Sequence, residues 1–211
     1  MPRRIMPNMH AITHTEQAID DIAKDGYAVI EQFLPAATIA ALANQALALK
    51  TAGSLRKAVT GKGQHPSSDG LRGDFIYWLE SPDSEAQQQY LQAMYELKAT
   101  LNCSLCMGLF EFETHFAVYP TGTGYTKHLD QLKNTQDRQI SSILYLNKNW
   151  QDDDGGTLRL YLNNSVHEDI TPLGGKLVVF LSSRFWHEVL PAKRERISLT
   201  GWFRTRSERP V

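Results

Sequence analysis

The chain has 211 residues, of which 42% are hydrophobic and 21% charged, and its formal net charge is −1. A chain of this length and apolar content can bury a sizeable core in one domain, and a second full domain is not expected. Because both signs of charge are mixed along the sequence, the composition argues against recruitment by nucleic acid or by an anionic membrane.

The N-terminal residues and the two cysteines give further exclusions. Arg3 and Arg4 are not followed by an apolar run, so we expect neither a secretory signal nor a membrane anchor, and we expect a cytoplasmic protein. Cys103 and Cys106 form a C-x-x-C pair, but no thioredoxin-like context and no further zinc ligands lie nearby. We interpret both as buried thiols without a function.

The first third of the chain alternates between helical and extended patterns. Residues 16–24 predict a short helix, residues 26–34 alternate like a strand, and the alanine- and leucine-rich residues 36–50 predict a helix that Pro35 opens. Residues 51–73 contain five glycines among basic and polar residues, which predicts a long mobile loop or hairpin. Loops of this length in a compact domain are commonly functional, so we expect this one to have a function. The loop leads into a strand within residues 71–80.

The remaining residues predict one more helix and then β-structure. A helix is expected over residues 81–101, with a capped start and an inner face made of Tyr90, Leu91, Met94, Leu97 and Leu101. Strands are expected over residues 109–119, 127–131, 139–146, 157–162, 176–182 and 198–204, with a tight turn at 152–156. Helices followed by many strands predict an α+β domain in which helices support one face of a β-sandwich or barrel.

Three residues form a candidate iron site. His128 and Asp130 stand two residues apart, so on an extended strand both side chains leave the same face and can bind one metal ion. We expect His187 to be the third ligand. Two imidazoles and one carboxylate leave coordination positions open, as non-haem Fe(II) requires for a co-substrate and oxygen.

Arg196 follows His187 on a predicted strand. Arg196, Ser198, Thr200 and Trp202 point to one side of this strand, and the residues between them point to the other. A guanidinium buried in a lined pocket needs a planar carboxylate, and the distal carboxylate of 2-oxoglutarate would satisfy it. Each feature is weak alone, but their order and spacing support one another.

Four segments together resemble a known family. They read YPTGTGYTKHLD (119–130), ILYLNKNW (143–150), GGTLRLY (155–161) and FWHEVLPAKRERISLTGWF (185–203). This set resembles the iron- and 2-oxoglutarate-dependent prolyl hydroxylases, in the branch of the hypoxia-inducible-factor prolyl hydroxylases and their bacterial relatives. The resemblance implies a single domain over residues 1–211, with a double-stranded β-helix (jelly-roll) core over 109–204 supported by N-terminal helices within 1–102.

The resemblance also implies roles for individual residues. His128, Asp130 and His187 would bind Fe(II). The residues that would bind 2-oxoglutarate are Arg196, Tyr145, Thr200, Tyr119 and Trp202. Those that would contact the substrate peptide or form the base of a finger loop are Arg138, Tyr125, Arg72 and Asp74. The sequence from Val59 to Gly70 departs from the family, which leaves the target peptide open.

The activity implied is hydroxylation of a prolyl residue in a protein, with O2 and 2-oxoglutarate as co-substrates, release of succinate and CO2, and ascorbate as reductant. Bacterial relatives act on elongation factor Tu, so a translation factor is a candidate partner, and we expect a monomer. An acidic residue at position 130 favours hydroxylation over halogenation, because halogenating relatives have a small residue there.

Several alternatives stay open at this point. A hydroxylase of free amino acids or other small molecules is the main one, since the core would be the same; the basic loop at 51–73 favours a protein substrate. A hydrolytic zinc enzyme would not need Arg196 buried with Tyr145, and an inactive cupin-like binding protein would be expected to lose a ligand or the arginine. His115 would face the pocket as a fourth metal ligand or, as we favour, as a hydrogen-bonded wall residue.

Overall fold

The computed structural model describes residues 9–59, 71–131 and 137–206, with only the backbone of residues 9–15. The helices are α1 (Met9–Asp25), α2 (Ala36–Thr51) and α3 (Glu85–Leu105), with a short 3-10 helix at Asp152–Asp154. The strands are β1 (Tyr27–Ile30), β2 (Arg56–Lys57), β3 (Phe75–Trp78), β4 (Glu111–Tyr119), β5 (Tyr125–His128), β6 (Arg138–Tyr145), β7 (Leu158–Tyr161), β8 (His167–Ile170), β9 (Leu177–Leu181), β10 (Trp186–Val189) and β11 (Arg196–Arg204).

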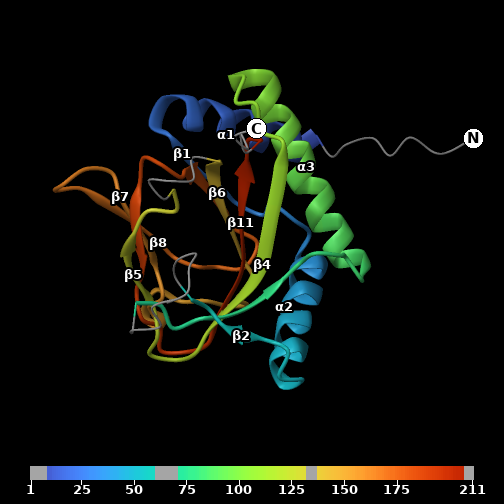
Figure 1. Cartoon of the computed structure of the whole chain (residues 1–211), viewed down its shortest axis with the longest axis vertical. Helices are drawn as coiled ribbons and strands as arrows, with labels where there is room; N and C mark the ends of the chain where they lie inside the picture. The colour runs from blue at the N-terminus through green and yellow to red at the C-terminus, as the bar shows by residue number, and fades with distance from the viewer. Residues whose placement is uncertain (1–8, 60–70, 132–136, 207–211) are drawn as a thin grey trace, which may run out of the picture.

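The described strands form two antiparallel sheets (Figure 1). The major sheet has the order β1-β9-β6-β11-β4-β3-β2, and the minor sheet has the order β5-β10-β7-β8. In Figure 1 the helices α2 and α3 lie on one side of the major sheet, while β5, β7 and β8 lie on the other side. This arrangement confirms the predicted α+β class.

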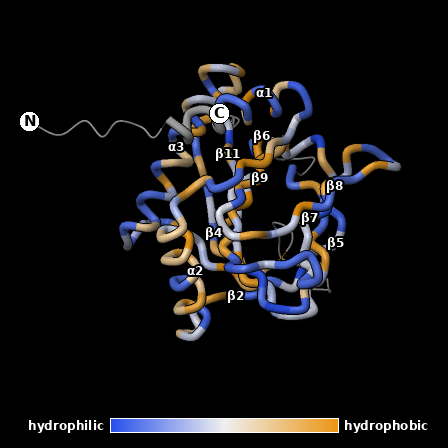
Figure 2. Tube along the Cα trace, turned by 180° about the vertical axis from the view of Figure 1, so that it is seen from behind, coloured by the Kyte–Doolittle hydropathy of each residue, from blue (hydrophilic) through white to orange (hydrophobic). Residues whose placement is uncertain are grey.

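Alternation along β11 separates two cores. Ile197, Leu199 and Phe203 pack with the helices, whereas Arg196 and Ser198, also buried, face the minor sheet. Figure 2 shows strand β9, which reads LVVFL, as hydrophobic. The neighbouring strands β6 and β11 also carry buried polar side chains, among them Ser141 and Ser198, which form part of the side that faces the minor sheet.

The helices are held on the sheet by local and long-range contacts. Helix α3 begins where the Ser84 hydroxyl accepts a hydrogen bond from the Gln87 N–H over 3.2 Å, which satisfies one free N–H of the first turn. Tyr90, Met94 and Leu101 along its inner face are fully buried, as the sequence predicts.

A second cluster, between the two sheets, contains Tyr145 and Phe180 among other apolar residues.

Some sequence-based predictions were wrong. Cys103 and Cys106 are free and exposed, because they lie on the outer side of the last turn of α3 and at its left-handed C-cap. The strand expected over 127–131 ends at His128, so Asp130 lies just beyond it. Strands β8 and β10 were missed, because each has only four residues and is largely polar or exposed.

The region predicted as a long loop is only partly described. Helix α2 extends to Thr51, and β2 then pairs with β3, Arg56 opposite Ile76. Residues 60–70 lie outside the described residues, so the prediction for them stays a prediction. Within the described parts of the chain, no helix is long and apolar enough to cross a membrane.

Candidate active site

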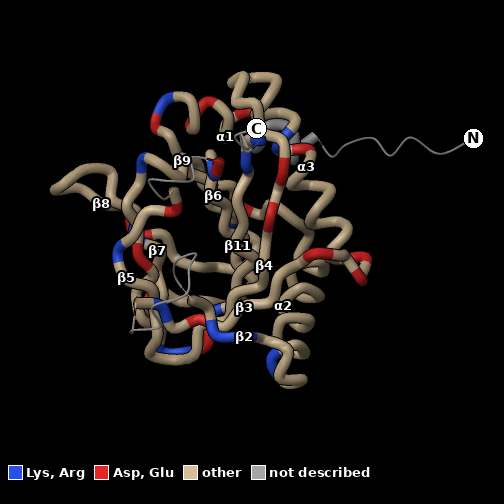
Figure 3. The backbone as a smooth tube through the Cα atoms, in the orientation of Figure 1, with Lys and Arg blue, Asp and Glu red and all other residues tan. Residues whose placement is uncertain are grey.

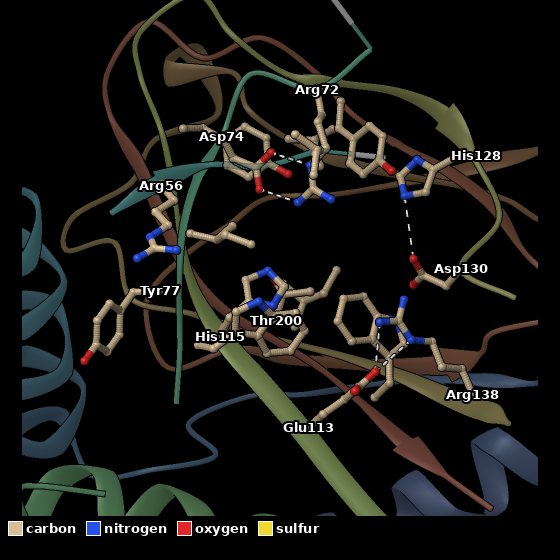
Figure 4. A pocket seen from close by; sticks show the side chains of 18 of the residues that line it. Arg56, Arg72, Asp74, Tyr77, Glu113, His115, His128, Asp130, Arg138 and Thr200 are labelled. Atoms are coloured by element: carbon tan, nitrogen blue, oxygen red, sulfur yellow. Dashed lines mark hydrogen bonds and ion pairs between the residues drawn. The ribbon is translucent and has the colours of Figure 1, made fainter. Parts of the chain in front are cut away.

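A cavity of about 850 Å³ lies between the major and minor sheets. Most of the predicted site residues line it: Arg72, Asp74, His115, Tyr119, Tyr125, His128, Asp130, Arg138, His187, Arg196, Thr200 and Trp202. Tyr145 lies behind this lining and is fully buried. Figure 4 shows several of these side chains around the open space.

The cavity contains one group of residues with the geometry to bind a metal ion among the described residues. The ligand atoms of His128, Asp130 and His187 all lie within 4.8 Å of one another. The two Nε2 atoms are 3.7 Å and 3.6 Å from the carboxylate oxygens of Asp130. These residues meet because His128 on β5 and His187 on β10 are paired across the minor sheet, while Asp130 follows β5 directly.

Backbone carbonyls fix the orientation of both imidazoles. The Nδ1 atom of His128 lies 2.7 Å from the Thr126 carbonyl oxygen, and that of His187 lies 3.1 Å from the Phe185 carbonyl oxygen. A carbonyl only accepts, so each Nδ1 carries the proton and each Nε2 presents a lone pair to the cluster. This tautomer is the one that metal-binding histidines use when their second nitrogen is anchored.

The charge states of the cluster also suit a cation. Burial alone would raise the pKa of Asp130, but the two imidazoles and the Ser141 hydroxyl, which donates over 2.6 Å, lower it below its usual value. Burial, and then the neighbouring His187, lower the pKa of His128 to about 4. At neutral pH the carboxylate is therefore ionised and the His128 ring is neutral, as binding of a divalent cation requires.

The guanidinium of Arg196 is buried, with 1% of its surface exposed, and it is incompletely paired. Its Nε donates to the Gly156 carbonyl over 2.9 Å, but its Nη2 has no hydrogen-bond partner among the described residues. The hydroxyl of Tyr145 also lacks a partner there, and the Arg196 Cζ lies 5.0 Å from the centre of the Tyr145 ring. Arg196 Nη2 and the Tyr145 hydroxyl are thus two neighbouring buried donors without partners among the described residues, and a ligand with a planar carboxylate could accept hydrogen bonds from both.

Cross-strand register places the aromatic neighbours of Arg196. Tyr119 on β4 is opposite Arg196, and the Arg196 Cζ is 5.1 Å from its ring centre. Tyr145 on β6 is opposite Ser198. Burial, opposed in part by Arg196, raises the pKa of both phenols, which keeps the hydroxyls protonated and able to donate hydrogen bonds.

Three of the predicted substrate residues, Arg72, Asp74 and Tyr125, form a continuous wall that reaches the metal cluster. Arg72 forms a bidentate pair with the fully buried Asp74, over 2.7 Å and 2.5 Å. The Arg72 guanidinium covers the Tyr125 ring at 4.7 Å, and this ring stacks on His128 with centres 3.6 Å apart. A ligand at the mouth of the cavity would therefore contact a wall that is connected to His128.

Arg138 lies on the other side of the cavity mouth, where the sequence had not revealed its partners. Its guanidinium covers the Trp202 ring at 3.6 Å and pairs with Glu113 over 2.8 Å. Glu113 also pairs with Arg204 over 3.2 Å. Glu113 and Ser141 were both missed by sequence reasoning, although alternation with Tyr145 would have placed Ser141 on the cavity side of β6.

His115 does not behave as predicted. It is 2% exposed, and neither ring nitrogen has a hydrogen-bond partner among the described residues, so the prediction of a hydrogen-bonded wall residue was wrong. It also lies outside the group formed by His128, Asp130 and His187. Burial, and then the charges of Arg72 and Arg138, lower its pKa to about 3, against the opposite influence of Asp130. The ring is therefore neutral at physiological pH.

Comparison with known proteins identifies related sequences and folds. Residues 114–204 match the family described as the 2OG-Fe(II) oxygenase superfamily. The chain is 30% identical to human prolyl hydroxylase EGLN3, over 87% of this chain and 80% of that protein. It spans only 28% to 60% of the length of four other curated relatives, the hypoxia-inducible factor prolyl hydroxylase of Caenorhabditis elegans and Egl nine homolog 1 of rat, mouse and human.

Two solved structures are similar over nearly the whole chain. A prolyl-4-hydroxylase from Pseudomonas putida is 43% identical, with a TM-score of 0.84 over 92% of this chain and 100% of that one. A prolyl hydroxylase from Trichoplax adhaerens, solved with a peptide fragment of the hypoxia inducible factor oxygen degradation domain, is 26% identical, with a TM-score of 0.84 over 94% of each chain. The two facing sheets are those of a double-stranded β-helix, which confirms the predicted fold.

Proposed function

The chain belongs to the prolyl hydroxylase branch of the 2OG-Fe(II) oxygenase superfamily, and we propose that it hydroxylates a prolyl residue of a protein substrate. In this reaction 2-oxoglutarate and O2 are consumed, and succinate and CO2 are released. The observation that carries the proposal is that Arg196, which lines the same cavity as His128, Asp130 and His187, and Tyr145 behind it are incompletely paired among the described residues. A hydrolytic metal site would have no use for a buried guanidinium that is incompletely paired.

His128, Asp130 and His187 would bind Fe(II), which supplies the activation of O2 that is coupled to oxidation of 2-oxoglutarate. Hydrogen bonds within the protein already orient these three side chains. Its carbonyl-anchored imidazoles present two Nε2 lone pairs, and the Ser141 hydroxyl holds one oxygen of Asp130. Such support around the ligands fixes their direction and so limits the reorganisation needed on binding.

Arg196, Tyr145 and Thr200 would bind the distal carboxylate of 2-oxoglutarate. The free Nη2 and the Tyr145 hydroxyl are donors, and a carboxylate offers acceptor sites to both. The site is buried, so the charge of Arg196 is not screened by water and its attraction for an anion is strong. Tyr119 and Trp202 would line the same pocket nearer the metal.

A protein substrate is supported by the mouth of the cavity and by one structural relative. Arg72, Asp74, Tyr125 and Arg138 line the cavity, and the Trichoplax relative was solved with a bound peptide. Figure 3 shows that Lys and Arg lie at β2, the edge strand beside this cavity. We propose elongation factor Tu as the first protein to test, and ascorbate as the reductant that keeps iron in the Fe(II) state.

The N-terminal helices would form one domain with the β-helix. Residues of α1, α2 and α3 and residues of the major sheet share a single hydrophobic core, which supports the proposal of one domain over 1–211. The helices would then support the metal and co-substrate sites from behind. Removing them would expose the apolar face of the strands that carry Arg196 and Tyr145.

The decisive experiment is incubation of the protein with Fe(II), 2-oxoglutarate, ascorbate and recombinant elongation factor Tu. Succinate formation and the addition of one oxygen atom to a proline would be followed by mass spectrometry. A matched reaction without 2-oxoglutarate controls for chemical oxidation. Strong stimulation of 2-oxoglutarate consumption by free proline, with no modification of any protein, would replace the proposal by a small-molecule hydroxylase.

A further inference from the structure

One buried polar side chain in the cavity has no role in binding the metal or 2-oxoglutarate as described above. His115 on β4 is opposite Trp78 on β3 and opposite Thr200 on β11, and all three residues line the cavity. Trp78 packs against the imidazole in an edge arrangement and Trp202 in a tilted one, with ring centres 4.8 Å and 5.6 Å away. These contacts leave both ring nitrogens unpaired among the described residues.

An unpaired buried nitrogen destabilises the folded protein, because the group has lost its hydrogen bonds to water without gaining others. Buried polar groups in native proteins are nearly always paired, so an exception inside a cavity points to a ligand that completes it. No described group of the chain supplies the missing hydrogen-bond partner of His115. Its partner is therefore expected to enter the cavity from outside the chain.

The position of His115 in the cavity indicates which kind of ligand could reach it. Thr200 lies four residues from Arg196 on β11, which places His115 roughly 13 Å along the sheet from the site for the distal carboxylate. On its other side, Trp78 is 40% exposed at the cavity mouth. Figure 4 shows His115 next to Thr200, with Arg72 and His128 across the open space. His115 thus borders the route from the mouth to the metal cluster.

The charge state of His115 narrows the chemistry of this ligand. Burial and the charges of Arg72 and Arg138 keep the ring neutral at physiological pH, against the opposite influence of Asp130 on its pKa. A neutral imidazole has one N–H donor and one acceptor nitrogen, and it has no net charge with which to attract a carboxylate. Its best match is a neutral polar group, and the main chain of a polypeptide offers one at every residue.

We propose that His115 binds the substrate polypeptide directly, by donating a hydrogen bond from a ring nitrogen to a main-chain carbonyl oxygen beside the target proline. The proposal rests on the proposed function and adds a substrate-binding residue to it. Trp78 and Trp202, whose ring centres lie 4.8 Å and 5.6 Å from that of His115, restrict the movement of the imidazole, so little freedom is lost when the bond forms. The bond would fix the peptide while leaving the 2-oxoglutarate site unchanged.

The test uses three variants of the full chain, His115→Leu, His115→Asn and His115→Gln. The probe is the proline-containing peptide that the wild-type protein hydroxylates best, selected from a peptide library that includes elongation factor Tu. For His115→Leu we expect the peptide KM to rise about 3- to 10-fold and the yield of hydroxyproline per succinate to fall. Substrate-free decarboxylation and the KM for 2-oxoglutarate should stay within about twofold of the wild type.

Two further readouts separate binding from a structural effect. Removing an unpaired buried polar group should raise the Tm of the peptide-free protein by about 2–4 °C. The amide of Asn reaches the position of Nδ1 and that of Gln reaches the position of Nε2, so the variant that restores the KM identifies the nitrogen. His167→Leu is the matched control, because His167 lies on β8 outside the cavity lining, and it should leave the peptide KM unchanged.

Three outcomes would overturn the proposal. The first is an unchanged peptide KM and hydroxyproline yield in His115→Leu, which would remove the substrate role. The second is loss of Mn(II) binding in this variant, which would make His115 a metal ligand. The third is a wild-type protein that hydroxylates no peptide in the library but responds to free proline. That third result would reject the proposed function itself, whereas the first two leave it intact.

Discussion

His187 and His128 are cross-strand partners in the minor sheet, and their rings lie 4.2 Å apart between centres at an angle of 56°. This pairing brings together two residues from distant parts of the chain, and Asp130 completes the cluster immediately after β5. The sheet register therefore builds the metal site, and the antiparallel contacts of β10 with β7 on its other edge stabilise it. Replacing the side chain of one metal ligand should therefore leave the strand pairing of the minor sheet intact.

Replacing His187 by Ala should abolish metal binding and 2-oxoglutarate turnover while the fold is kept. The imidazole projects into the cavity, so its removal leaves a ligand position empty without breaking the strand pairing of β10. Titration with Mn(II) measures the first effect and far-UV circular dichroism the second. Bound metal together with normal turnover in this variant would refute the assignment of the ligands.

Arg196→Gln should keep the metal but lose affinity for 2-oxoglutarate by about 2–5 kcal/mol, since an amide supplies neither the charge nor the forked donors. Tyr145→Phe removes a single hydroxyl and should cost only about 1 kcal/mol. Isothermal titration with 2-oxoglutarate in the presence of Mn(II) gives both values. If both variants bound 2-oxoglutarate like the wild type, the co-substrate pocket would have to be placed elsewhere.

Shortening the segment between Val59 and Ser68 should reduce prolyl hydroxylation and spare slow decarboxylation of 2-oxoglutarate without substrate. His128, Asp130, His187 and Arg196 lie on or directly after strands, so the metal and co-substrate sites do not depend on this segment. A peptide, by contrast, must be held close to the reacting centre. Product and succinate are measured in parallel, and an equal loss of both would show that the segment supports the core instead.

The stability of the metal-free protein should fall as the pH is lowered from about 6.5 towards 4. Burial lowers the pKa of His115 to about 3 and that of His128 to about 4, so below pH 6.5 the unfolded chain binds protons that the folded chain does not. Each such proton changes the free energy of unfolding by about 1.4 kcal/mol per pH unit. The free energy of unfolding, measured with urea at a series of pH values, should depend less steeply on pH in His115→Leu, by up to the contribution of one proton. An identical slope in both proteins would contradict the prediction.

Much of the site could be predicted from the sequence because its signals are local. Arg196, Thr200 and Trp202 follow the two-residue period of one strand, so their common face can be read without knowing the fold. The spacing of His128 and Asp130 indicated one cluster, but the strand expected to carry both ends at His128. The apolar pattern of Tyr90, Met94 and Leu101 likewise identified the buried face of a helix. Each of these inferences depends only on spacing within a single element.

The tertiary structure decided which polar atoms find partners. Glu113 pairs with Arg138, whereas Nη2 of Arg196 and the nitrogens of His115 find no partner among the residues that the structure describes. These outcomes depend on cross-strand register and on side chains from distant strands. The exposure of Cys103 and Cys106 depends on how α3 is turned against the sheet. Spacing fixes the direction of a side chain from its own backbone, but its hydrogen bonds depend on groups that only long-range folding brings near.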